Sequence, residues 1–371
     1  MFLDELKKRN VPSLKSRAEM LELLQREEYG CLPKAPESFV WEAEPGVADN
    51  FCAGKATLEK LTFRVVVNGK DFAFPVYLAV PTAEGPHPFF VHINFRSDVP
   101  DRYMPTEELI DNGFSVLSFG YEDVTRDDSD FTSGLAGVLY ENGKRAPHDA
   151  GKIALWAWAA MRCMDYAEHD ERLDCAKSVV CGHSRLGKTA LLTAALDTRF
   201  AFGYSNDSGC AGAALFRSKK GEQLDDIYRQ FPFWFSKSFG QYVGKTDALP
   251  FDQHYLLASI APRYVYVASA AGDDWADPAS ELLSCYAAAA GDKEAFPYEE
   301  TSEDYDFNLH AGRIGYHRRP GLHYFSREDW NRFIAFFKSK QKGEKSRAVI
   351  IRRAAYCRPL GDPLIGSPTR E

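Results

Sequence analysis

The first part of the chain combines a helical pattern of apolar residues with two strand-like patterns. Residues 14–28 repeat apolar positions at helical spacing. Residues 58–66 and 72–80 have strand-like patterns and flank an Asn-Gly pair at 68–69, a dipeptide typical of two-residue hairpin turns. The pattern therefore predicts an N-terminal helix followed by a β-hairpin.

From residue 88 onwards, apolar strand-like runs alternate with segments of helical periodicity. This alternation predicts an α/β fold, a three-layer sandwich in which helices cover both faces of a mostly parallel central sheet. In such sheets, functional residues lie at the carboxyl ends of the strands. The predicted strands are 88–94, 114–119, 177–181, 202–206 and 264–270, and the predicted helices are 106–112, 148–169, 186–196, 278–290 and 327–338.

Two segments fall outside this alternation. Residues 120–147 carry many Asp residues and no clear periodicity, and loops of that length are usually functional or disordered. Residues 341–371 are rich in Arg and Pro with little periodicity, so we expect a peripheral C-terminal extension. Residues 1–340 are predicted to form a single α/β domain, of which residues 1–30 are an N-terminal helical extension.

Composition narrows the possible partners. The chain has 371 residues, of which 45% are hydrophobic, so it can bury a large core. Its net charge is −8 and it has no block of Lys or Arg, which argues against binding to nucleic acid or to an anionic membrane. The longest apolar stretch, residues 153–161, is too short to span a bilayer.

The N-terminus and the cysteines favour a cytoplasmic protein, with a secreted protein that has lost its leader as the alternative. The chain starts MFLDELKKRN, where no apolar run follows a basic start, so no signal peptide is visible. The eight cysteines are scattered without a close pair. That distribution is typical of reduced thiols, and it resembles neither a zinc site nor a disulfide framework.

The segment at residues 178–189, SVVCGHSRLGKT, is the most informative part of the chain. It runs from an apolar strand through a tight turn into a helix, which fits a nucleophile elbow with Ser184 at the turn. Gly182 meets the requirement for a small residue two places before the serine. The second glycine of the G-x-S-x-G pattern is displaced by one place, because Leu186 precedes Gly187.

The same segment also matches a phosphate-binding P-loop. Residues 182–189 satisfy G-x-x-x-x-G-K-[ST] in full. In that interpretation, Lys188 reaches the β- and γ-phosphates of a nucleotide and Thr189 holds magnesium. The strand-then-helix context fits both chemistries, so the choice depends on residues elsewhere in the chain.

The rest of the chain favours a hydrolase. A P-loop enzyme needs an acid that ends an apolar strand, and residues 265–273 are a poor version of that. An α/β-hydrolase needs an acid and a histidine after the serine, in that order. Asp207 follows the predicted strand at 202–206, and His323 lies in a loop before the last predicted helix. Asp274 and Asp277 are alternative acids. His310 and His317 are rivals of His323 and are interpreted as surface or supporting residues.

Several short segments together resemble carbohydrate esterase family 15, the glucuronoyl esterases. The first is the Gly-x-Ser-Arg-x-Gly-Lys segment at 182–188, and the likeness covers roughly residues 29–338. Members of this family hydrolyse esters between lignin alcohols and the 4-O-methyl-glucuronate groups of xylan. The other segments are Ser-Asn-Asp-Ser-Gly at 205–209, Arg-Gln-Phe-Pro-Phe-Trp-Phe at 229–235, Asp-Asp-Trp-Ala-Asp-Pro at 273–278 and Gly-Tyr-His-Arg-Arg-Pro-Gly-Leu-His at 315–323.

The resemblance implies an α/β-hydrolase fold and a role for each matching residue, with no metal or organic cofactor. Ser184 matches the nucleophile, His323 the base and Asp207 the acid. An oxyanion-supporting role falls on Arg185. The residues that match contacts to the uronate sugar are Lys188, Gln230 and Trp275.

One position departs from the family pattern. Ser238 stands about eight residues beyond Gln230, where the family often has a Glu. The expected function is therefore hydrolysis of carbohydrate esters, most of all 4-O-methyl-glucuronoyl esters, through an acyl-enzyme on Ser184. Other polysaccharide esterases, such as an acetyl xylan esterase, remain an alternative, as does a P-loop NTPase that uses residues 182–189.

Overall fold

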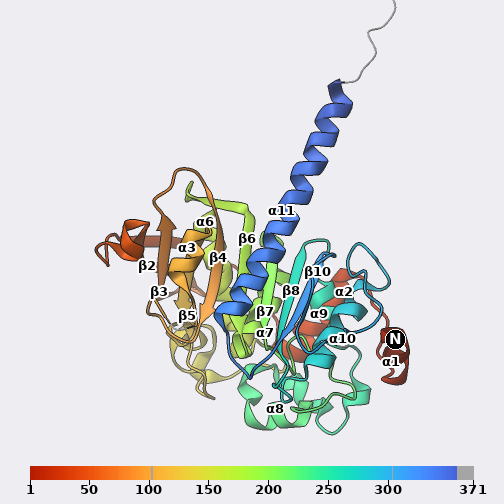
Figure 1. Ribbon diagram of the computed structural model, residues 1–371. Coiled ribbons are helices and arrows are strands. Elements are labelled where there is room, and N and C mark those ends of the chain that lie inside the picture. The colour runs from red at the N-terminus through yellow and green to blue at the C-terminus, as the bar shows by residue number, and fades with distance from the viewer. Residues whose placement is uncertain (102, 303, 357–371) are drawn as a thin grey trace, which may run out of the picture.

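A ten-stranded sheet runs through the molecule in the computed structural model (Figure 1). The structure describes the backbone of residues 1–356 apart from 102 and 303, and side chains as far as residue 341. The strand order is β1-β2-β3-β5-β4-β6-β7-β8-β10-β9. The strands are β1 (Ser38–Glu44), β2 (Ala56–Val67), β3 (Lys70–Pro81), β4 (His87–Asn94), β5 (Ser115–Gly120), β6 (Leu173–His183), β7 (Phe202–Asn206), β8 (Tyr264–Ala270), β9 (Phe307–Leu309) and β10 (Ile314–Arg319).

The six strands from β5 to β10 in this order are parallel, and the outer strands β1, β2, β3 and β9 pair antiparallel. The longer helices are α6 (Lys152–Ala167), α7 (Arg185–Leu196), α10 (Pro278–Ala289) and α11 (Arg327–Tyr356). The shorter α-helices are α1 (Phe2–Lys8), α2 (Arg17–Leu23), α3 (Thr106–Asp111), α4 (Tyr121–Val124), α5 (Gly134–Leu139), α8 (Leu224–Gln230) and α9 (His254–Ala258).

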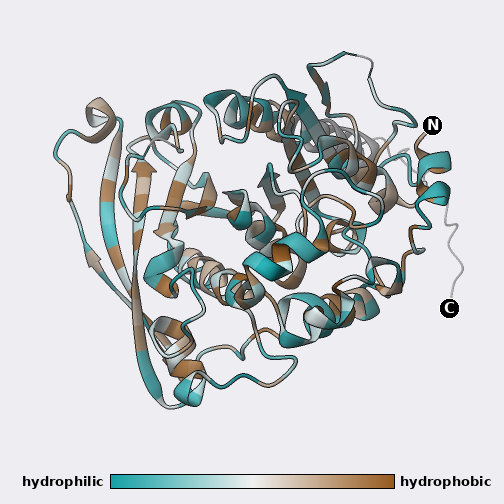
Figure 2. Ribbon diagram, turned by 90° about the horizontal axis from the view of Figure 1, so that it is seen from below, coloured by the Kyte–Doolittle hydropathy of each residue, from teal (hydrophilic) through white to brown (hydrophobic). Residues whose placement is uncertain are grey.

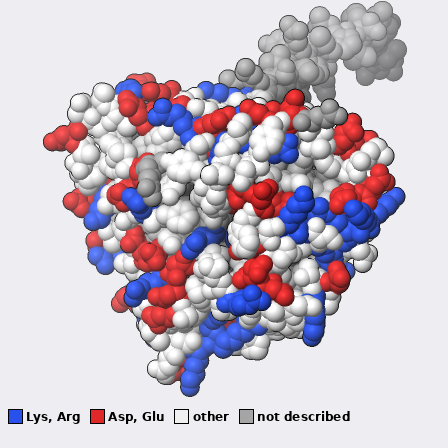
Figure 3. Space-filling model, turned by 60° about the horizontal axis from the view of Figure 1, so that its bottom comes forward, with Lys and Arg blue, Asp and Glu red and all other residues white. Residues whose placement is uncertain are grey.

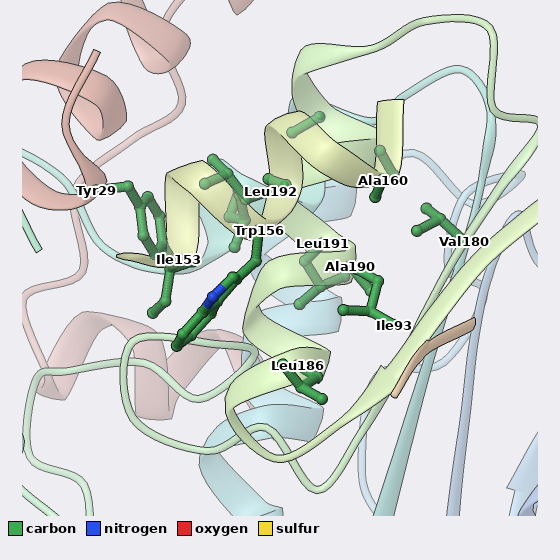
Figure 4. Close-up of a cluster of buried hydrophobic side chains, with 14 of the residues drawn as sticks. Tyr29, Ile93, Ile153, Trp156, Ala160, Val180, Leu186, Ala190, Leu191 and Leu192 are labelled. Atoms are coloured by element: carbon green, nitrogen blue, oxygen red, sulfur yellow. The ribbon is translucent and has the colours of Figure 1, made fainter. Parts of the chain in front are cut away.

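Two hydrophobic cores separate the layers. On one face, α6 and α7 pack against β4 and β6, and Figure 4 shows Leu191 of α7 next to Ile93 of β4. On the other face, aromatic side chains of α11 such as Trp330 pack against the central strands. Burying both faces explains why the parallel strands read as continuous apolar runs. The predicted three-layer sandwich with a mostly parallel sheet is confirmed.

The antiparallel side of the sheet follows a different rule. The long strands β2 and β3 on the left of Figure 2 alternate between hydrophilic and hydrophobic residues. Such alternation is expected where one face packs on the core and the other meets solvent. The hairpin predicted around the Asn-Gly pair is confirmed, since β2 and β3 pair antiparallel across residues 68–69.

The order of the parallel strands creates a switch point beside β6. The chain goes from β4 to β5 on one side, and then returns to place β6 on the other side of β4. Ligands in open α/β sheets bind at such a reversal, beyond the carboxyl ends of the strands. The turn that follows β6 contains Ser184, so the fold brings the predicted nucleophile to this position.

The structure differs from the sequence-based prediction in three segments. Residues 120–147 contain α4 and α5 instead of one long loop. The segment from residue 341, predicted to be a peripheral C-terminal extension with little periodicity, continues α11 to Tyr356, while residues 357–371 lie outside the described part. The strand β10 was missed because its sequence, IGYHRR, is rich in polar residues that are nevertheless buried. Among the described residues, no helix is long and apolar enough to cross a membrane.

Candidate active site

Ser184 lies at a strained turn between β6 and α7. Its backbone has φ 57° and ψ −125°, a conformation that costs energy for a residue with a side chain and that tends to occur at functional sites. The turn is tight, because a Cβ atom on Gly182 would lie 2.4 Å from the carbonyl oxygen of Leu186. The geometry agrees with a nucleophile elbow, in which the serine hydroxyl stands above the sheet.

The displaced second glycine of the motif has a structural explanation. A Cβ on Gly187 would lie 2.9 Å from the hydroxyl oxygen of Ser205 on β7. The residue that must be small is therefore the one that faces the neighbouring strand. Leu186, which occupies the expected glycine position, instead points into the core, where it is completely buried.

The P-loop interpretation is wrong for this segment. The helix α7 begins directly at Arg185, so residues 182–189 do not form an open loop around a phosphate. Lys188 is buried and donates to the carbonyl oxygen of Ser208 at 2.5 Å. Thr189 donates to the carbonyl oxygen of Arg185 within the helix at 3.0 Å. Neither side chain is placed for nucleotide phosphates or magnesium.

Arg185 projects from the first turn of α7 into an aromatic and acidic environment. Its guanidinium pairs with Asp127 and lies 4.8 Å from the ring centre of Trp234. The indole N–H of Trp234 donates to the other oxygen of Asp127 at 2.6 Å, and the Tyr121 hydroxyl donates to Asp127 at 3.1 Å. Asp127 was not identified from the sequence, because the Asp-rich segment 120–147 offers many acids of equal local context.

Arg185 lines the same pocket as Ser184, and its side chain is 28% exposed. A guanidinium in a pocket can stabilise negative charge that develops on a bound oxygen atom.

His323 lies beside this turn and is held by a carboxylate. Its Nδ1 is 2.6 Å from the Oδ2 atom of Asp273, and the imidazole is 44% exposed. The buried ring of His183 lies 4.4 Å from that of His323 between ring centres. Burial and the neighbouring His323 lower the pKa of His183 to about 3, so His183 is neutral at physiological pH. The arrangement holds one imidazole at the pocket without placing a second charge beside it.

The carboxylate partner of His323 differs from the prediction. Asp207 was expected there, but Oδ1 of Asp207 accepts from the backbone N–H of Ala270 at 2.7 Å, and Oδ2 lies 3.5 Å from Arg319. Burial and the carboxylates of Glu281 and Asp329 raise the pKa of Asp207 well above its usual range. A carboxyl group that resists ionisation is a poor partner for an imidazolium.

The two alternative acids are also wrong as direct partners of His323. Asp274 is exposed, and Asp277 is the N-cap of α10, where it accepts from the backbone N–H and the hydroxyl of Ser280. The acid that the structure selects, Asp273, directly precedes Asp274 and follows β8. In the sequence, Asp273 could be recognised only as an acid that follows an apolar strand, and Asp274 and Asp277 have the same property.

The three groups Asp207, Asp273 and His323 are close together, with one side-chain ligand atom of each within 4.8 Å of the others. Two carboxylates and an imidazole at this spacing are also a set that metal ions use as ligands. Here Nδ1 of His323 is already bonded to Asp273, and Asp207 is bonded to the backbone and paired with Arg319. These bonds fit a group that holds and orients a proton-accepting imidazole.

The predicted residues surround one pocket of about 360 Å³, which is large enough for a sugar residue. The described side chains form no direct hydrogen bond between Ser184 and His323, although both line this pocket. Catalytic hydrogen bonds often tighten only when substrate binds. The lining residues are Ser184, Arg185, Lys188, Asp207, Ser208, Gly209, Glu222, Gln230, Phe231, Trp234, Asp273, Trp275, Ala276 and His323.

The pocket combines a buried charged floor with an exposed wall. Lys188 was expected near the pocket mouth, but it lies at the floor, and burial lowers its pKa. Glu222, which the sequence did not single out, also lines the floor. Gln230 at the end of α8 is exposed, and Trp275 is 56% exposed. In Figure 1, α8 lies below the sheet and marks this end of the molecule. Ser238 is not among the lining residues.

A buried acid behind the pocket makes stability depend on pH. Burial raises the pKa of Glu28 to about 8, and the side-chain amide of Gln253 donates to both of its oxygens at 2.7 and 2.8 Å. The folded protein therefore keeps a proton that the unfolded chain loses near the usual value of 4.5. Stability should fall as pH rises through this window, by up to about 1.4 kcal/mol per pH unit from this group.

Glu28→Gln is expected to flatten the decrease in melting temperature between pH 5 and pH 8, because an amide has no proton to lose. Thermal unfolding of both proteins across this range measures the difference in slope. Two parallel curves would contradict the pKa assigned to Glu28. Glu281, whose pKa burial raises to about 7, remains in both proteins, so some pH dependence should persist in the variant.

Comparison with known proteins resolves the family. The family model for fungal glucuronyl esterase matches residues 63–293. The chain belongs to the glucuronoyl esterase family. A carbohydrate esterase of an unknown prokaryotic organism is 41% identical over 239 residues, which are 62% of this chain and 54% of that protein. The 4-O-methyl-glucuronoyl methylesterase of Podospora anserina is 30% identical over 269 residues, 69% of this chain and 51% of that protein.

This member of the glucuronoyl esterase family spans about half the length of those two relatives. Among solved structures, a promiscuous carbohydrate esterase family 15 esterase from a marine bacterial metagenome superposes with a TM-score of 0.78 at 31% identity, covering 87% of this chain and 91% of that one. The resemblance noted in the sequence and the predicted α/β-hydrolase fold are thereby confirmed.

Proposed function

We propose that this chain is a serine carboxyl-ester hydrolase that acts on 4-O-methyl-glucuronoyl esters through an acyl-enzyme on Ser184. The observation that carries the proposal is the pairing of Asp273 with His323 at a pocket that also contains the strained Ser184. Family membership and the name of the Podospora anserina relative support the substrate class.

In the proposed first half-reaction, the hydroxyl oxygen of Ser184 attacks the ester carbonyl carbon while Nε2 of His323 accepts its proton. Asp273 keeps the Nδ1 proton of His323 in place and stabilises the imidazolium. The developing oxyanion accepts from Arg185 and from backbone N–H groups at the start of α7. Loss of one such donor typically costs about 3–4 kcal/mol of transition-state stabilisation.

In the second half, His323 protonates the departing alcohol oxygen, and the C–O bond to the alcohol breaks. A water molecule then gives its proton to His323 and attacks the acyl carbon, which releases the uronic acid and restores the Ser184 hydroxyl. Every proton in this cycle therefore moves through one imidazole.

The uronate half of the ester is assigned to the pocket floor and wall. Lys188 and Glu222 together offer a donor and an acceptor, which suit neighbouring sugar hydroxyls. Gln230 adds an amide, and the exposed face of Trp275 can stack on a pyranose ring. Ser238 stands where the family often has an acid, and its hydroxyl contacts Pro147 and His148 outside the pocket. In this chain, Glu222 supplies a carboxylate to the pocket.

The experiment that tests the proposed function compares three esters. Methyl and benzyl 4-O-methyl-glucuronate should be hydrolysed, and acetylated xylan should be hydrolysed poorly or not at all. Preferential release of acetate from xylan would replace the glucuronoyl proposal with the acetyl xylan esterase alternative. Failure on all three esters, with folded protein, would contradict the esterase proposal itself.

Lys188→Met is expected to raise KM for methyl 4-O-methyl-glucuronate by about tenfold or more, because a hydrogen bond to a charged donor contributes about 1.5–3 kcal/mol. Phenyl acetate, which has no sugar, should show little change in kcat/KM. Initial rates on both esters measure the ratio. The control variant is Lys237→Met, since Lys237 is exposed and does not line the pocket. Equal losses on both esters would argue against sugar recognition by Lys188.

The surface agrees with an uncharged or weakly charged polymer as substrate. On the face shown in Figure 3, which brings the lower end of the molecule forward, acidic and basic side chains are interspersed. A surface of mixed sign does not concentrate one kind of ion. The nucleic-acid and membrane partners that composition argued against therefore play no part in the proposal.

A further inference from the structure

Arg319 ends β10 and directly precedes the loop that carries His323. Its Nη1 donates to the carbonyl oxygens of Pro320 at 3.1 Å and Leu322 at 3.4 Å, and its Nη2 donates to the carbonyl oxygen of Tyr324. These carbonyls belong to residues on both sides of His323. The guanidinium thus holds the loop around the imidazole from within.

The same guanidinium contacts two buried acidic side chains. Its Nε donates to Asp329 on α11 at 2.7 Å, and its Nη2 lies 3.5 Å from Asp207. Asp329 is itself held, because Nε2 of His317 and the hydroxyl of Ser326 donate to it at 2.8 and 2.7 Å. The Arg319 side chain is only 4% exposed, so water cannot replace these partners without opening the core.

Glycines allow the loop to approach this guanidinium. Gly321 has φ +108°, and a Cβ there would lie 3.0 Å from Nη1 of Arg319. The loop is also joined to the one that precedes Asp273, since the N–H of Gly272 donates to the carbonyl of Gly321 and that of Ala271 to the carbonyl of Arg319, both at 2.8 Å. A shift of the loop that carries His323 would therefore also move Asp273.

We propose that Arg319 is the positioning residue of the catalytic histidine: its guanidinium sets the loop 320–324 so that His323 meets both Ser184 and Asp273. The inference rests on the proposed esterase function. Its physical basis is the planar fork of five N–H donors, which only arginine offers. A lysine at this position keeps the charge beside Asp207 but cannot reach three carbonyl oxygens and a carboxylate at once.

The test compares Arg319→Lys and Arg319→Met with the wild-type protein, using methyl 4-O-methyl-glucuronate. Both variants are expected to lose about a hundredfold in kcat, because small misplacements of catalytic groups have effects of that size. KM should stay within about twofold, since the pocket floor is untouched. A second readout is the rate at which phenylmethylsulfonyl fluoride labels Ser184, which requires His323 but no sugar and should fall in parallel.

The matched control is Arg318→Lys. Arg318 is the preceding residue on β10 and also donates to backbone carbonyls, those of Tyr305 and Asp304 at 3.3 and 2.7 Å, but these acceptors lie outside the loop that carries His323. Its kcat and labelling rate should be unchanged. Titrating active sites with the sulfonyl fluoride corrects kcat for any unfolded fraction.

The outcomes distinguish failure of the positioning role from failure of the esterase function. Full activity in Arg319→Lys together with loss in Arg319→Met would assign Arg319 a purely electrostatic role and overturn the positioning inference. A rise in KM at constant kcat would overturn it too. If the Arg319 variants do not fold, Gly321→Ala crowds the same guanidinium and should lower kcat at constant KM; unchanged kcat would again refute the inference. Wild-type protein that neither turns over the ester nor labels at Ser184 would remove the proposed function itself.

Discussion

Ser184→Ala should lower kcat for methyl 4-O-methyl-glucuronate by at least about 10⁴-fold. The hydroxyl is the only group that forms the proposed acyl-enzyme, and removal of one member of such a triad leaves only the catalysis due to binding and the oxyanion site. The measurement is the steady-state rate at saturating ester, followed by mass spectrometry after a rapid quench. An acyl adduct should appear on the wild-type protein and be absent from the variant.

The loss in Ser184→Ala should occur without unfolding or loss of sugar binding. Alanine keeps the Cβ atom of serine and so leaves the backbone strain of the turn unchanged, and the melting temperature should not fall by much. A suitable control is Ser16→Ala, which removes the N-cap of α2 and should cost about 1 kcal/mol of stability while leaving kcat intact. Residual activity above about one per cent in Ser184→Ala would mean that another group attacks the ester.

Asp273→Asn should have the second-largest effect, a fall of about 10³- to 10⁴-fold in kcat. The amide cannot stabilise the imidazolium of His323 and favours the wrong tautomer of the ring. Asp207→Asn should cost less than about tenfold, because Asp207 already resists ionisation and its oxygen serves the backbone N–H of Ala270. Steady-state kinetics of both variants, corrected by active-site titration, measure the ratio of the two effects.

The control for these substitutions is Asp274→Asn, the same chemical change at the exposed neighbour of Asp273. Its kcat should equal that of the wild-type protein. A larger loss in Asp207→Asn than in Asp273→Asn would restore the assignment made from the sequence. It would also mean that the bond between His323 and Asp273 at 2.6 Å rearranges when the ester binds.

Several strands could be predicted from the local pattern of residues alone. The strands predicted at 202–206 and 264–270 have the same bounds as β7 and β8, because each is a short segment rich in aromatic or β-branched residues that is followed by turn residues. The strand β10 was missed because its His and Arg side chains, including Arg319, are buried by partners about ten or more residues away. Strand propensity cannot detect a polar residue whose acceptors lie on another element.

The candidate site shows the same division. Ser184 could be located from its flanking glycines and the strand-to-helix pattern, which are local. The choice of acid could not be made in that way, because Asp273 meets His323 across fifty residues of chain through loop contacts. The burial of Lys188 could not be predicted either. Helical spacing places Lys188 on the correct face of α7, but it does not show that the ammonium group donates to the carbonyl oxygen of Ser208.

The nearly half-exposed imidazole of His323 has a consequence for the size of molecule that the protein can process. The cavity has room for roughly one monosaccharide unit, and the group that would protonate the departing oxygen stands at its rim. In the proposed cycle, the alcohol could therefore remain in bulk solvent throughout. An ester linkage embedded in a branched polymer would need only to present a single side group, and the remainder of the polymer would stay outside the protein.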